Sequence, residues 1–118
     1  MLDGVFARGT TPTQIFPLPC MVRHSDLVDY TIAYRQKGKT VLVKSKEDTC
    51  CLREIDCERN IVIVLPQEDT LIFNPNIKIV EVQIKGVTTG NDVFLIGEYR
   101  LRLEDVFDDN PFDLKEYE

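Results

Sequence analysis

The chain has 118 residues, of which 43% are hydrophobic and 29% are charged, and its formal net charge is −6. This length suits one ordinary domain with a real core. Nucleic-acid binding depends mainly on Lys and Arg contacts to phosphate, so an acidic chain without a basic run is not expected to bind DNA or RNA. The same charge disfavours an anionic membrane surface, and no stretch approaches the ~20 apolar residues of a membrane span.

The first part of the chain predicts an arm and then strands. Residues 1–12 are expected to form an N-terminal arm. Residues 13–18 lie among prolines, which predicts either an edge strand or an irregular one, because proline cannot donate to a ladder. From Val28 to Tyr34, an apolar or aromatic residue occupies every second position. This period of two predicts a strand over residues 27–36 with one buried face. The turn at Lys37 and Gly38 and a second strand over residues 40–46 complete a hairpin.

The second part of the chain continues the pattern. Residues 50–55 are expected to form a short strand, and the continuous apolar run over residues 60–65 predicts a central one. Near residues 67–72, acidic and then apolar residues follow Pro66, which predicts one helical turn that crosses between sheets. Residues 77–87 and 93–103 form a final predicted hairpin around a loop of turn-forming residues.

Short strands at a spacing of roughly 8–12 residues predict a sandwich or barrel. We expect an all-β fold, an immunoglobulin-like antiparallel sandwich of about seven strands over residues 13–104. Residues 105–118 form an acidic C-terminal tail, which is either a solvated end or an arm whose Phe107 and Phe112 dock on a neighbouring subunit. Thr10, Thr11 and Pro12 either order the chain before the first strand or contact another subunit.

The residue types that carry chemistry are few. Without a recognisable secretion signal, the four cysteines are expected to be reduced thiols; they are Cys20, Cys50, Cys51 and Cys57. A structural zinc site needs paired ligands at a regular spacing, which these cysteines and the single histidine, His24, do not offer. No nucleophile motif or phosphate loop is present, and the acidic pairs lie in polar turns. We therefore expect no catalytic residue, no cofactor and no metal, and no enzyme activity.

A resemblance to a known family supplies a setting. Its most specific piece is the segment Gln67–Thr70, and the run Arg8–Thr13, the alternation from Tyr30 to Tyr34 and the final strand pair complete it. This pattern resembles short proteins encoded in prophages of Gram-positive bacteria, often among tail genes. More distantly, it resembles the immunoglobulin-like N-terminal domain of phage baseplate upper proteins. The resemblance implies a virion protein without catalysis, assembled in the cytoplasm of the bacterial host.

Two functions remain open from the sequence. In the first, the protein is a tail or baseplate component that contacts other virion proteins or copies of itself, since exposed sheet edges invite pairing. In the second, it is a small accessory module that recognises a host protein or a surface glycan through loops around Asp48, Asp56 and Gly90.

Overall fold

The structure is a computed structural model that describes residues 2–18, 27–48, 51–55, 58–107 and 111–112, with only the main chain of 51–55 and 58–59. Its strands, in chain order, are β1 (Gly4–Ala7), β2 (Thr13–Pro17), β3 (Leu27–Gln36), β4 (Lys39–Ser45), β5 (Cys51–Ile55), β6 (Glu58–Val64), β7 (Ile79–Thr88) and β8 (Val93–Glu104). A 3-10 turn, η2 (Lys46–Asp48), follows β4, and a one-turn helix, α1 (Gln67–Thr70), follows β6.

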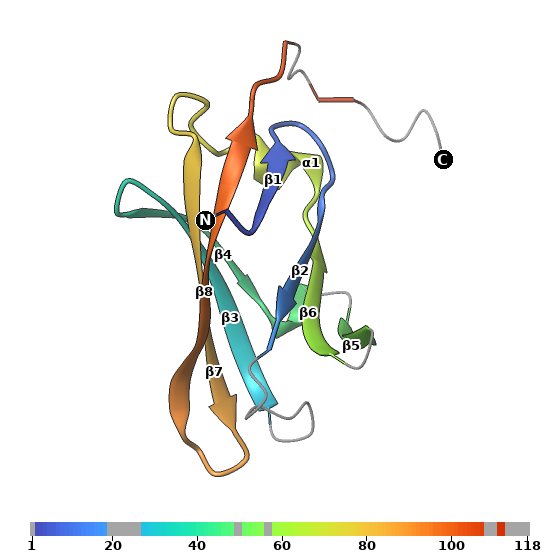
Figure 1. Ribbon diagram of the computed structural model, residues 1–118, viewed down its shortest axis with the longest axis vertical. Coiled ribbons are helices and arrows are strands. Elements are labelled where there is room, and N and C mark those ends of the chain that lie inside the picture. Colours follow the sequence, from blue (N-terminus) through green and yellow to red (C-terminus); the bar gives the residue numbers. More distant parts are fainter. Residues whose placement is uncertain (1, 19–26, 49–50, 56–57, 108–110, 113–118) are drawn as a thin grey trace.

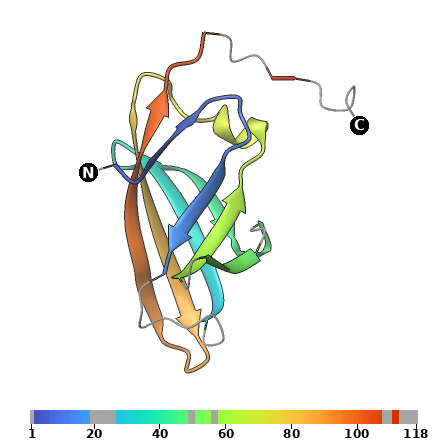
Figure 2. The ribbon, with the colours of Figure 1, turned by 45° about the vertical axis from the view of Figure 1, so that its right-hand side comes forward.

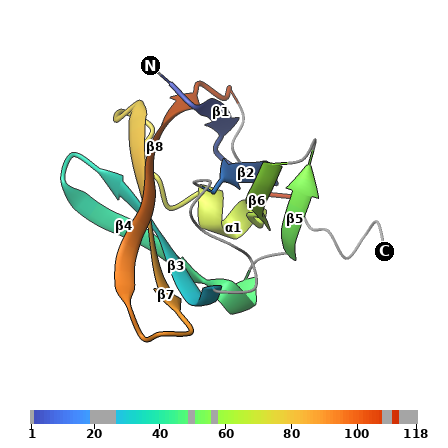
Figure 3. The same ribbon diagram turned by 60° about the horizontal axis from the view of Figure 1, so that its bottom comes forward.

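The strands form two sheets that face each other. One sheet has the order β1-β8-β7-β3-β4 and the other the order β2-β6-β5. Figure 3 shows the five-stranded sheet along one side, the three-stranded sheet along the other, and α1 between them. In a variable-type immunoglobulin sandwich, strands C′, C, F and G form one sheet and strands B, E and D belong to the other. The strands β4, β3, β7 and β8 take the places of C′, C, F and G, and β2, β6 and β5 take those of B, E and D. The predicted immunoglobulin-like sandwich is therefore confirmed.

The strand β1 lies where the sequence predicted an arm. It pairs in parallel with β8, so that Phe6 lies opposite Leu103. Phe6 is buried, and its ring packs edge to face against the ring of Phe73, with 5.2 Å between the ring centroids. The expected arm over residues 1–12 therefore contains an edge strand, which brings the described strands to eight where about seven were expected. Four residues are too few to show a period, and their partner lies almost a hundred residues away.

The core lies between the sheets and is built from alternate residues of the facing strands. Its buried members are Phe6, Phe16, Leu27, Tyr30, Ile32, Tyr34, Ile61, Ile63, Leu65, Phe73, Val80, Val82, Ile84, Ile96, Leu101 and Leu103. The predicted alternation in β3 holds for Tyr30, Ile32 and Tyr34 but fails at Val28, which is exposed. The pairing of β3 with β7 shifts between Leu27 and Asp29, and this irregularity turns Leu27 inward in place of Val28.

Turn chemistry and one polar bridge fix the arrangement. Lys37 and Gly38 both have positive φ, 48° and 77°, as a two-residue hairpin turn of type I′ requires. Across the core, the Tyr34 hydroxyl of β3 donates to the Gln14 side-chain oxygen of β2 at 2.5 Å. Burial raises the pKa of the Tyr34 phenol, and the nearby Asp69 carboxylate adds to this increase. The bridge therefore satisfies two polar groups between the sheets.

The two ends of the sandwich differ. Figures 1 and 2 place α1 and the loop between β1 and β2 at one end, and the β7–β8 hairpin at the other. The chain also leaves β8 at the α1 end (Figure 1). Two segments that are distant in the sequence, the loop after β1 and the chain after β8, therefore lie at the same end as α1.

Candidate functional site

The helix α1 is a single turn between β6 and β7. Pro66 precedes it with an extended backbone, and the Pro66 carbonyl accepts the main-chain N–H of Asp69 at 3.1 Å. Proline suits a helix start because its φ is already fixed near the helical value. Three of the four residues of α1 use their side chains to hold other segments.

Thr70 joins α1 to the loop that follows β1. Its hydroxyl oxygen accepts the main-chain N–H of Gly9 at 3.0 Å and lies 3.0 Å from the carbonyl oxygens of both Thr10 and Gln67. Thr70 is fully buried, so these bonds replace water that its hydroxyl cannot reach. The Arg8 guanidinium adds a bond of 2.8 Å to the Leu71 carbonyl. The loop is thus fixed against the C-terminal end of the helix.

Gln67 joins α1 to the C-terminal tail. Its side-chain oxygen accepts the main-chain N–H of Phe112 at 3.1 Å, and its side-chain NH₂ donates to the Phe112 carbonyl at 2.6 Å. Gln67 is buried, whereas Phe112 is 67% exposed. The tail is therefore held through its main chain, and the aromatic ring is left facing solvent.

Asp69 joins α1 to the five-stranded sheet. Its carboxylate forms an ion pair with the Lys44 ammonium of β4, and both side chains are largely shielded from solvent. Because such a pair is screened less than a surface pair, it holds α1 against β4 more firmly than an exposed contact would. Glu68, the remaining residue of α1, is exposed and takes no part in these contacts.

The structure brings together part of the predicted subunit-contact set. Thr10 and Phe112 both meet α1 through their main chains, and the Pro12 carbonyl accepts the Leu65 N–H at 3.0 Å. Thr11 and Phe107 are exposed. The segment Gln67–Thr70 carries the most specific part of the resemblance, but the sequence alone assigns no role to Gln67 or Thr70. A buried glutamine and threonine in a one-turn helix show their partners only once the fold is known.

The predicted alternative loops are only partly described. In η2, the Asp48 carboxylate accepts the Ser45 main-chain N–H at 2.9 Å, and this bond lowers the pKa of Asp48. Asp48 therefore shapes its own turn. Gly90 lies in the exposed β7–β8 turn. Asp56, Cys20, His24, Cys50 and Cys57 lie outside the described residues, as does the side chain of Cys51. Within the described part of the chain, no three His, Cys, Asp or Glu side chains gather as metal ligands would.

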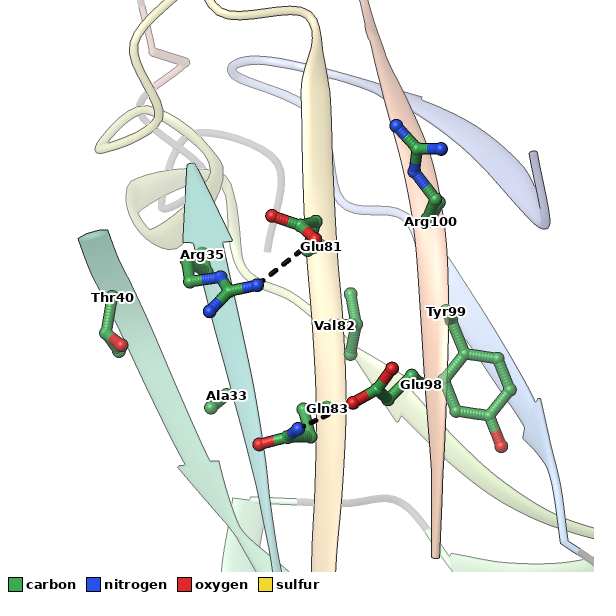
Figure 4. A pocket seen from close by; sticks show the side chains of 9 residues that line it. All are labelled: Ala33, Arg35, Thr40, Glu81, Val82, Gln83, Glu98, Tyr99 and Arg100. Atoms are coloured by element: carbon green, nitrogen blue, oxygen red, sulfur yellow. Dashed lines mark hydrogen bonds and ion pairs between the residues drawn. The ribbon is translucent and has the colours of Figure 1, made fainter. Parts of the chain in front are cut away.

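A shallow depression of about 290 Å³ lies on the outer face of the five-stranded sheet (Figure 4). Arg35 of β3 bonds Glu81 of β7 at 3.1 Å, and Gln83 of β7 bonds Glu98 of β8 at 2.9 Å. Each pair bridges two neighbouring strands. Ala33 lies beside them on β3, and its small side chain leaves space for the depression (Figure 4). Four of the lining side chains are paired with one another, and the lining carries both signs of charge, an arrangement that suits a polar protein contact.

Across the part of the chain that the structure describes, no helix is long and apolar enough to cross a membrane.

Among known proteins, the chain is similar only at low sequence identity to the solved structures named below. No family model matches the chain, and no curated protein matches it. CopC from Methylosinus trichosporium OB3b is 12% identical, with a TM-score of 0.49 over 91% of each chain. The immunoglobulin-like domain of mouse leukocyte-associated immunoglobulin-like receptor 1, solved as a strand-swapped dimer, is 10% identical, with a TM-score of 0.42 over 87% of this chain and 90% of that one. The V domain of amphioxus IgVJ-C2 is 13% identical, with a TM-score of 0.31 over 86% and 99%.

Proposed function

We propose that the protein is a non-catalytic structural protein of a phage or prophage particle, a component of the tail or baseplate that acts through protein–protein contacts at the α1 end. The observation that carries this proposal is the convergence on α1 of the loop after β1 and the C-terminal tail, through Thr70 and Gln67. This helix is also the segment with the most specific resemblance to prophage tail-region proteins.

The chemistry of the α1 end suits contact rather than reaction. Its amide, hydroxyl and carboxylate are all engaged in bonds that hold chain segments in place. The tail beside it presents the exposed aromatic rings of Phe107 and Phe112. Exposed apolar groups near a rigid polar support are typical of a protein contact surface. The partners we propose are other virion proteins and further copies of this chain, assembled in the host cytoplasm.

The proposal is tested by fractionating a lysate of the induced host on a density gradient. The chain should sediment with tails or whole particles and stay with them through a high-salt wash. A chain found only among the slowly sedimenting soluble proteins would overturn the proposal. Light scattering of the purified chain at micromolar concentration measures self-association separately.

A second candidate is a module that recognises a host protein or glycan. The depression over Ala33 favours it, because Arg35, Gln83 and Glu98 are held there in fixed positions. Selective capture of one host component, abolished by replacing Gln83 with Arg but retained in a Gln67→Ala variant, would favour this function over a particle role.

A further inference from the structure

The contact between Gln67 and Phe112 recognises a main chain. One side-chain amide serves the N–H and the carbonyl of a single residue, at 3.1 and 2.6 Å. Directly opposed residues in antiparallel strands exchange two hydrogen bonds in the same way. The Phe112 side chain takes no part in this exchange. Any extended segment that reaches Gln67 with the same spacing of donor and acceptor can therefore occupy the site.

The chain's own tail is held there lightly. Among the tail residues that the structure describes, 105–107 and 111–112, Asp105 forms an exposed ion pair with Lys78, and Phe107 is fully exposed. Exposed ion pairs contribute little to stability. Val106 is half-buried directly after β8, so residues 105–107 stay with the sheet. The described residues 111–112 are held through the two bonds between Gln67 and Phe112, which a tail from elsewhere can replace.

Apolar surface near the site is also left uncovered. Val64 ends β6 just before α1, and Ile15 of β2 lies on the same outward face of the three-stranded sheet. Both are exposed, as is Ile72 after the helix. The exposed phenylalanines of the tail and these exposed aliphatic side chains are apolar surfaces that both remain open within one copy.

Charge does not oppose a contact between copies. Residues 105–118 contain six acidic residues and one lysine, which leaves 14 acidic and 13 basic residues in residues 1–104. Most of the net negative charge therefore lies in the tail, and the body that would receive a second tail is nearly neutral. An acidic tail meets weaker repulsion from such a body than from another tail.

We propose that Gln67 is the docking site for the C-terminal tail of a second copy, so that neighbouring copies exchange tails through the main chain of Phe112. This exchange is a form of domain swapping. It deepens the proposed function and rests on it for the close spacing of copies in a particle. A short tether keeps the chain's own tail at an effective concentration on the order of millimolar. Exchange therefore becomes important where copies are crowded.

The test uses two full-length variants that complement each other. Gln67→Ala keeps the tail but removes the site, and Phe112→Pro keeps the site but removes the main-chain N–H that the site binds. The Gln67→Ala chain is labelled with ¹⁵N, and the Phe112 amide signal is followed by NMR as unlabelled Phe112→Pro chain is added to about 1 mM. Unlabelled Gln67→Ala chain is the matched control, because it has no site to offer.

The expected result is a concentration-dependent shift of the Phe112 signal toward its wild-type position with the Phe112→Pro chain, and no shift with the control. Equal behaviour of the two titrations would overturn the proposal, as would a Phe112 amide in the wild type that exchanges with solvent as fast as in Gln67→Ala. A chain that sediments with particles but shows no such shift would remove this inference and leave the proposed function standing. A shift from a chain absent from particles would support tail exchange and remove the proposed function.

Discussion

The hydroxyl of Thr70 lies 3.0 Å from the carbonyl oxygen of Thr10, although sixty residues separate the two in the chain. The same hydroxyl accepts the N–H of Gly9, and the side chain is fully buried. One threonine thus fixes the loop that connects the two sheets at their β1 and β2 edges. The α1 helix therefore acts as the anchor of this end of the sandwich.

Replacing Thr70 with Val tests this anchor. Valine keeps the shape but removes the hydroxyl, so the Gly9 N–H loses its partner. A fully buried donor without a partner costs about 1–3 kcal/mol of unfolding free energy, and the half-buried Gly9 N–H should lie toward the lower end of this range. Urea unfolding of Thr70→Val should show a loss of that size, and the matched Thr70→Ser variant should keep most of the wild-type stability. Equal stability of the two variants would mean that the hydroxyl is not what holds the loop.

The ion pair between Lys44 and Asp69 is expected to couple β4 to α1. A double-mutant cycle with Lys44→Met and Asp69→Asn should give a coupling free energy of about 1 kcal/mol, because both side chains are largely shielded. The coupling should change little between low and moderate salt. Additive single-variant effects in urea unfolding would show that the pair is solvated and without effect.

Tyr34 makes the stability depend on pH in the alkaline range, above the ordinary tyrosine pKa of 10.0. Burial raises its pKa above the ordinary value of 10.0, so the folded state keeps the proton longer than the unfolded chain. The resulting stability is fully present below pH 10 and decreases above it, by up to about 1.4 kcal/mol per pH unit.

Tyr34→Phe lacks this titration and also leaves the Gln14 oxygen without the donor that it has in the wild type. The variant should be less stable than the wild type at pH about 8, and the difference should shrink toward pH about 11.5 in urea unfolding. A difference that stays constant over this range would mean that the phenol is not buried as described.

The sequence predicted some parts of this molecule well and others not at all. The alternation of Tyr30, Ile32 and Tyr34 predicted β3 because one buried face imposes a period of two. The two bonds between Gln67 and Phe112 could not be predicted, since they join main-chain groups to an amide 45 positions away and leave no periodic trace. The sequence pointed to Thr70 only as part of a resemblance. Its anchoring role could not be predicted, because it depends on which main-chain groups the fold brings to the buried hydroxyl.

The outer face of the five-stranded sheet should tolerate change. Arg35 and Glu81 form an exposed pair, and such pairs contribute little. Glu81→Gln should therefore change the unfolding free energy by less than about 0.5 kcal/mol. A larger loss in urea unfolding would show that this face contributes to the stability of the fold. Substitutions on this face could then not be used to test binding without also changing stability.

The most direct test of the contact role is quantitative mass spectrometry of purified particles from hosts that produce the wild type, Thr70→Val or Glu81→Gln. We predict that the wild type and Glu81→Gln occur at the same constant ratio to the other virion proteins, and that Thr70→Val, with its loop released from α1, occurs at a lower ratio at equal soluble expression. A wild-type chain that is absent from the particles would contradict the account.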